Sequence, residues 1–102
     1  MARATFVKTS WETWVVAANF EDDLVDGETI VLATSTITAV DDSGNDVSSA
    51  VLNPAYKAVN GSLLQIRVIN GTEALSVYTV LFRAITNQDN RYSLKIDMKI
   101  KN

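Results

Sequence analysis

Hydrophobic and polar residues alternate most regularly near the C-terminal end of the chain. Between residues 91 and 101 every second position is hydrophobic, and these positions are Tyr92, Leu94, Ile96, Met98 and Ile100. A period of two predicts a β-strand with one face in the core and the other in solvent. Residues 75–86 are similarly strand-like and precede the turn residues 88–90, so the two segments are expected to pair as antiparallel strands.

Earlier segments also have the composition of strands. Within residues 64–68 hydrophobic and polar side chains alternate. This segment lies between two Asn-Gly dipeptides, which favour tight turns. Residues 30–40 are rich in β-branched side chains and predict a long strand, in which a change of hydrophobic parity indicates a bulge. Residues 47–52 predict a short strand. Pro54 marks a strand end or edge, because proline has no backbone N–H to donate to a sheet.

Residues 1–20 allow two interpretations. The spacing of one helix face is present at Trp11, Trp14, Val15 and Ala18. The β-branched residues in this segment favour a strand instead, and we favour strands and irregular structure, as either an edge strand or a docking arm. The whole pattern predicts about seven strands with turn residues every 8–12 positions, which is typical of an antiparallel two-sheet sandwich. Residues 1–102 are expected to form this all-β fold as a single domain.

Composition removes several kinds of chemistry. The 102 residues include no histidine and no cysteine, so histidine or thiol catalysis, structural zinc and disulfides are not expected. Nine basic and twelve acidic residues give a net charge of −3, which argues against nucleic-acid binding by phosphate neutralisation. No apolar run approaches the roughly 18 residues of a membrane span, and the charged start does not predict a signal peptide. We therefore expect no cofactor, membrane association or signal-directed secretion.

Two acidic segments are candidates for cation binding. The first consists of Glu21, Asp22, Asp23, Asp26 and Glu28. Its spacing matches no known calcium loop, so a solvated loop is favoured. The second, residues 41–46, has its glycine at the fourth position rather than the sixth and is interpreted as a hairpin loop. No acidic residue is expected in an apolar setting that would raise its pKa for acid catalysis, so the sequence predicts no enzymatic activity.

The aromatic and glycine residues have mainly structural interpretations. Trp11 and Trp14 are candidates for a sugar-binding platform, although a tryptophan in a small sandwich more often fills the core or covers a sheet edge. Tyr78 lies near the start of the penultimate strand, where sandwiches often have a tyrosine whose hydroxyl bonds to upstream backbone. Gly27 and Gly71 are expected in turns.

Three stretches carry a resemblance to a known group of proteins. Residues 23–30, DLVDGETI, are similar to that group's "L-x-x-G-D/E-T-I" motif, and residues 78–80, YTV, to its "Y-x-V" segment. Residues 82–87, FRAITN, resemble its aliphatic strand ending in Thr-Ser, which is followed by a turn and an alternating last strand. Over residues 20–101 the chain thus resembles small bacteriophage and prophage proteins with an immunoglobulin-like sandwich. A glycine pair usually precedes the tyrosine in that group, whereas here only Gly71 is near.

The resemblance implies an immunoglobulin-like fold and a non-enzymatic structural or assembly role in the head–tail or tail region of a virion. The implied partners are other virion or assembly proteins, or further copies in a homo-oligomer. The implied location is the host bacterial cytoplasm during assembly, or the virion itself. Candidate interface residues are Trp11 and Trp14 with three apolar residues on outer strand faces, Ile69, Leu81 and Ile85. The alternative is an immunoglobulin-like surface module that binds carbohydrate or a host receptor.

Overall fold

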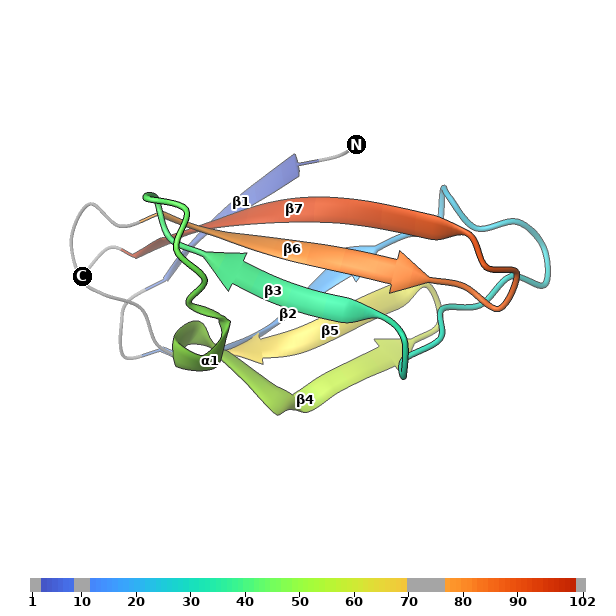
Figure 1. The fold of residues 1–102 in the computed structure, drawn as a ribbon, viewed down its shortest axis with the longest axis horizontal. Helices are drawn as coiled ribbons and strands as arrows, with labels where there is room; N and C mark the ends of the chain where they lie inside the picture. Colours follow the sequence, from blue (N-terminus) through green and yellow to red (C-terminus); the bar gives the residue numbers. More distant parts are fainter. Residues whose placement is uncertain (1–2, 9–11, 70–76, 101–102) are drawn as a thin grey trace.

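Seven β-strands and one short helix make up the fold in the computed structural model, which describes residues 3–8, 12–69 and 77–100 (Figure 1). The elements are β1 (Arg3–Lys8), β2 (Trp14–Asn19), β3 (Thr36–Val40), α1 (Ser48–Val51), β4 (Leu52–Asn60), β5 (Leu63–Val68), β6 (Val77–Ile85) and β7 (Arg91–Ile100).

The strands form two sheets that pack face to face (Figure 1). One sheet has four strands in the order β1-β7-β6-β3, and the other has three in the order β2-β5-β4. All neighbouring strands are antiparallel except β1 and β7, which run parallel. Consecutive strands lie in different sheets at four places along the chain: β1 and β2, β2 and β3, β3 and β4, and β5 and β6.

This connectivity is immunoglobulin-like. In a constant-type immunoglobulin domain, strands B, E and D lie in one sheet and strands C, F and G in the other. Here β2-β5-β4 take the places of B-E-D, and β3-β6-β7 take the places of C-F-G. The first strand differs from that arrangement, because β1 pairs with β7 rather than extending the three-stranded sheet. The predicted all-β, immunoglobulin-like two-sheet sandwich of about seven strands is confirmed.

The core lies between the sheets and is built by alternate residues of the strands. In β5 and β6 buried and half-exposed positions alternate, as a strand with one covered face requires. The buried hydrophobic side chains come from both sheets and from the connections, and the larger ones include Phe20, Leu64, Ile66, Phe82 and Met98. Among the described residues, every buried side-chain nitrogen or oxygen atom has a hydrogen-bond partner.

The prediction of one long strand over residues 30–40 is wrong. Ile30 makes an isolated bridge to Thr86, and β3 begins only at Thr36. Between them the chain turns, because the backbone N–H and the hydroxyl of Ser35 both donate to the carbonyl of Val31, at 3.1 and 2.7 Å. The same hydroxyl accepts the N–H of Ile85 at 3.1 Å, so a side chain replaces a backbone partner at the end of the β3–β6 pair.

The prediction of a strand over residues 47–52 is also wrong, since residues 48–51 form the single-turn helix α1. Ser48 is held there by Asp46, whose Oδ1 accepts both the N–H and the hydroxyl of Ser48, at 2.9 and 2.7 Å. The next strand, β4, is an edge strand with a shift of register between Asn53 and Ala58. Pro54 lies in this irregular part, so its prediction at an edge is confirmed.

Residues 1–20 contribute edge strands to both sheets. β1 is an outer strand of the four-stranded sheet, and β2 is an outer strand of the three-stranded sheet. β2 replaces the helical interpretation of Trp14, Val15 and Ala18. Within the described ranges, no helix has the length and apolar character needed to cross a bilayer.

Candidate functional site

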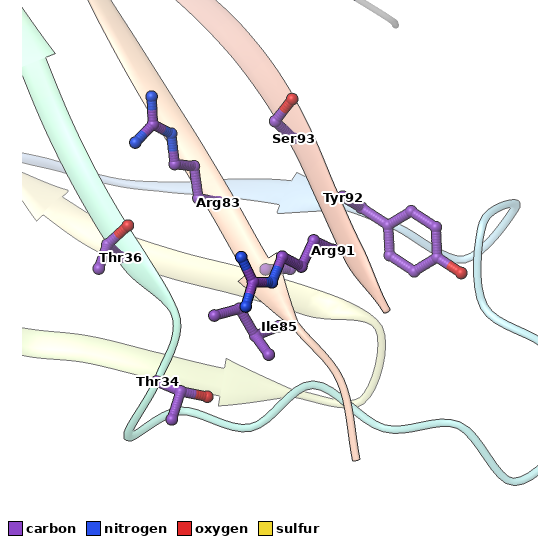
Figure 2. Close-up of a pocket in the computed structure, with 8 residues that line it drawn as sticks. Thr34, Thr36, Arg83, Ile85, Arg91, Tyr92 and Ser93 are labelled. Carbon is purple, nitrogen blue, oxygen red and sulfur yellow. The ribbon is translucent and has the colours of Figure 1, made fainter. Parts of the chain in front are cut away.

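An open depression of about 390 Å³ lies on the outer face of the four-stranded sheet (Figure 2). Its lining comes from the turn before β3 and from β3, β6 and β7: Thr34, Thr36, Arg83, Ala84, Ile85, Arg91, Tyr92 and Ser93. In Figure 2 the guanidinium groups of two arginines extend towards the threonine side, whereas the ring of Tyr92 points the other way. We call this depression the arginine groove.

Strand register brings the two arginines together. Arg83 lies opposite both Thr36 on β3 and Ser93 on β7, and Ile85 lies opposite Arg91. The two arginines are therefore diagonal neighbours on one face, a separation of about 7–8 Å that long side chains can bridge. Both are exposed, and within the described part of the chain neither makes an ion pair. The groove thus presents two positively charged guanidinium groups beside the half-buried Ile85.

The same sheet face continues to be basic along β7. Lys95 and Lys99 are exposed on the face that carries Arg91, four and eight positions after it along the strand. One carboxylate lies among them, that of Asp97, whose Oδ1 accepts a hydrogen bond from the hydroxyl of Thr79 at 3.1 Å. A chain with an overall charge of −3 therefore concentrates positive charge on one sheet face.

Acidic side chains gather next to this face, on the connection between β2 and β3. Glu21, Asp22, Asp23 and Asp26 are all exposed, and we call residues 21–26 the acidic loop. The loop lies at the same end of the sandwich as the β6–β7 turn (Figure 1). A second depression of about 420 Å³ lies between them and is lined by Asn19, Asp22, Asp23, Arg91, Tyr92, Ser93 and Leu94. Arg91 is common to both depressions, so the acidic loop and the arginine groove are adjacent surfaces.

A buried carboxylate joins the acidic loop to the β6–β7 turn. Glu28 is only 5% exposed. Its Oε2 accepts the hydroxyl of Thr86 at 2.6 Å and the amide of Asn90 at 2.7 Å. Its Oε1 accepts the N–H of Val25 at 3.2 Å and the hydroxyl of Tyr92 at 3.3 Å. We call these five residues the Glu28 clasp; all four donors in it are neutral.

The clasp keeps Glu28 ionised. The hydrogen bond from Thr86, followed by those from Asn90, Val25 and Tyr92, lowers the pKa of the Glu28 carboxyl below its ordinary value, although burial acts in the opposite direction. Burial and the negative charge of Glu28 raise the pKa of the Tyr92 phenol, so the phenol stays protonated and can donate. A lowered pKa is the reverse of what a general acid needs at neutral pH. Glu28 is therefore a buried negative charge whose role is to hold the surrounding segments in place.

The burial of Glu28 corrects the interpretation of the first acidic segment as a wholly solvated loop. Four of its five acidic residues are exposed, but the fifth is enclosed. In the described part of the chain, no three side chains of acidic or other metal-binding type are placed to share a metal ion. In the second acidic segment, the Oδ1 of Asp41 accepts the N–H groups of Ser43 and Asn45, each at 2.9 Å. The carboxylate of Asp41 therefore stabilises the loop in which it lies.

The predicted structural residues lie in different places. Gly27 lies in the turn after the acidic loop with φ of +81°, a region that favours glycine. Tyr78 is buried between the sheets on β6. The hydroxyl of Tyr92 donates a hydrogen bond to an upstream residue, the carboxylate of Glu28, at 3.3 Å. Gly71 lies outside the described residues.

The four candidate interface residues that the structure describes do not form a single cluster, although two of them share one face. Leu81 and Ile85 are half-buried on the outer face of β6, and Ile85 lines the arginine groove. Trp14 is half-buried at the start of β2 and packs against the core. Ile69 follows β5 and donates its N–H to the carbonyl of Val51 at 2.9 Å. Trp11 lies outside the described residues.

Sequence reasoning missed both arginines and the role of Glu28. The arginines had a usable signal, because Arg83 and Arg91 occupy polar-parity positions on two strands joined by a short turn. Glu28 had none, because its partners Thr86, Asn90 and Tyr92 follow it by 58–64 positions. No protein-family model, curated protein sequence or solved structure matches the chain. Strand order and register therefore carry the fold assignment.

Proposed function

We propose that this protein is a non-enzymatic structural or assembly module of a bacteriophage or prophage. It acts in the head–tail or tail region through contacts with other assembly proteins or with further copies of itself. It works in the host bacterial cytoplasm during assembly, or in the virion itself. The phage context is supported by the resemblance of residues 20–101 to phage sandwich proteins.

The observation that carries the role in protein–protein contact is the outer face of the four-stranded sheet. Leu81, Arg83 and Ile85 follow one another on this face along β6, and the exposed charge of Arg91 lies beside Ile85 on β7. Protein–protein interfaces combine apolar side chains with polar ones and are enriched in arginine, as this face is. The arginine groove is only partly enclosed, whereas a site for a small ligand usually buries most of that ligand's surface.

The chemistry of the buried carboxylate of Glu28 supports a structural role as well. Glu28 is surrounded by hydrogen-bond donors, and its lowered pKa keeps it charged. Its four bonds fix the acidic loop against the β6–β7 turn. A fixed loop loses little conformational entropy when a partner binds, and such preorganisation favours specific assembly.

The experiment that tests the proposal is genetic. The coding sequence is deleted in a bacterial strain that carries it, particle formation is induced, and the particles are counted, tested for infectivity and examined by electron microscopy. We expect unjoined heads and tails or malformed tails, and we expect restoration by a plasmid copy of the wild-type sequence. Normal numbers of complete, infectious particles from the deletion strain would refute the proposal.

A further inference from the structure

We propose that the acidic loop of one copy of this protein binds the arginine groove of a second copy, and that the contact is reciprocal. This inference rests on the proposed function as an assembly module and names the partner surface. Its two halves are Asp22 and Asp23 with the rest of residues 21–26 on one side, and Arg83 with Arg91 on the other. The contact would pair carboxylates with guanidinium groups, which form strong, directional hydrogen bonds.

Charge complementarity is the first argument. Glu21, Asp22, Asp23 and Asp26 are exposed on the loop, and Arg83 and Arg91 have no ion-pair partner among the described residues. Two adjacent guanidinium groups repel each other until carboxylates approach them. A segment with several carboxylates is the occupant that this groove best accommodates, and the chain itself supplies one.

Apolar complementarity is the second argument. The acidic loop carries Val25, whose side chain is 57% exposed in the middle of the acidic residues. The arginine groove carries Ile85, half-buried between the two arginines. Each surface thus presents an aliphatic side chain among charged ones, and the charges on the two surfaces are of opposite sign. Burial of these aliphatic groups adds a contribution that does not weaken with salt.

Adjacency is the third argument, and it determines the symmetry. Arg91 lines both the arginine groove and the depression that contains Asp22 and Asp23. When two complementary surfaces adjoin on one molecule, a two-fold axis between them places each surface against its complement on the other copy. The Glu28 clasp fixes the loop in this position, because Glu28 holds Val25 on one side and Tyr92, the neighbour of Arg91, on the other. The inferred assembly is therefore a closed dimer, with two copies of each contact.

The test uses reciprocal charge reversal on the full chain. One variant carries Arg83→Glu and Arg91→Glu, and the other carries Asp22→Lys and Asp23→Lys. Size-exclusion chromatography with light scattering is run over a concentration series at low salt and again at about 0.5 M salt, where charge interactions are strongly screened. We expect the wild type to form dimers that weaken at high salt. Each variant alone should be monomeric where the wild type is dimeric, because like charges then face each other.

The equimolar mixture of the two variants is the decisive sample. In the mixed pair, the two glutamates introduced into the groove of one variant would meet the two lysines introduced into the loop of the other, and the remaining contact is the native one. We therefore expect a dimer with one copy of each variant. A matched control carries Lys95→Glu and Lys99→Glu, which makes the same change of charge on β7 outside both depressions. It should dimerise like the wild type.

Three results would overturn the inference: a wild type that stays monomeric, a control that loses dimers as the variants do, or a mixture that stays monomeric. Circular dichroism and thermal unfolding establish that each variant is folded. If a reversal variant is unfolded, Arg83→Gln with Arg91→Gln replaces it, and this neutral pair should weaken the dimer at least tenfold. None of these results affects particle formation in the deletion strain, so failure of this interface and failure of the proposed function are distinguishable.

Discussion

Replacement of Ser35 by alanine tests how the turn before β3 is held. The Ser35 side chain is buried, and its hydroxyl donates to the carbonyl of Val31 at 2.7 Å and accepts the N–H of Ile85 at 3.1 Å. In Ser35→Ala the Val31 carbonyl keeps the backbone N–H of residue 35 as a donor, at 3.1 Å. The Ile85 N–H loses its partner, and an unsatisfied buried donor costs about 1–3 kcal/mol. We expect the free energy of unfolding to fall by that amount.

Urea unfolding followed by tryptophan fluorescence measures this change. The midpoint should fall while the slope of free energy against urea stays the same, because the surface exposed on unfolding is unchanged. The melting temperature should fall by about 4–8 °C for each kcal/mol. Ser43→Ala is the matched control, because Ser43 is exposed in the loop after β3, and it should change stability by less than about 0.5 kcal/mol. Equal midpoints for the two variants would refute the role given to the Ser35 hydroxyl.

Three further outcomes are expected. Phe82→Ala removes a fully buried ring and should lower the free energy of unfolding by about 3–5 kcal/mol, whereas Val15→Ala, at an exposed position, should have little effect in the same urea assay. Because the pKa of Glu28 is lowered by folding, its contribution to stability is complete above the ordinary glutamate pKa of about 4.3 and is lost as the pH falls through the lower folded value. Thermal unfolding of Glu28→Gln between pH 2 and 7 should therefore show a shallower loss of stability in acid than the wild type, and an equal loss would contradict the clasp. The Arg67 guanidinium lies 4.0 Å from the centre of the Tyr56 ring, so a double-mutant cycle with Arg67→Ala and Tyr56→Ala should give a coupling of about 0.5–1 kcal/mol, and no coupling would exclude the contact.

The strands with the simplest alternation could be predicted from the sequence. β5, β6 and β7 each have one face covered by the other sheet, so a buried hydrophobic residue occurs at every second position of β5 and β6, and hydrophobic and polar residues alternate along β7. The same parity places Leu81 and Ile85 on the outer face of β6, where the structure has them. The hydrophobic pattern predicts these strands because a shift of their register by one residue would expose the whole hydrophobic face of a strand.

The segments that were mispredicted depend on side-chain bonds to the backbone. Residues 30–40 have strand-forming side chains throughout, yet Ser35 turns the chain through its bonds to Val31 and to Ile85, which lies 50 residues away. Residues 48–51 form a helical turn because Asp46 bonds the N–H and hydroxyl of Ser48. Such hydrogen bonds compete with strand pairing without changing the hydrophobic pattern.

In the candidate site, too, one part could be predicted from the sequence and another part could not. The register of β6 and β7 follows from their alternation and from the turn between them, and it makes neighbours of Arg83 and Arg91. The position of Glu28 depends on donors that follow it by about sixty residues, so nothing near it in the sequence separates it from the exposed carboxylates. The acidic loop and the arginines adjoin because that buried carboxylate ties one segment to the other. A substitution that disrupts the Glu28 clasp should therefore weaken the proposed dimer without altering any residue on its surface.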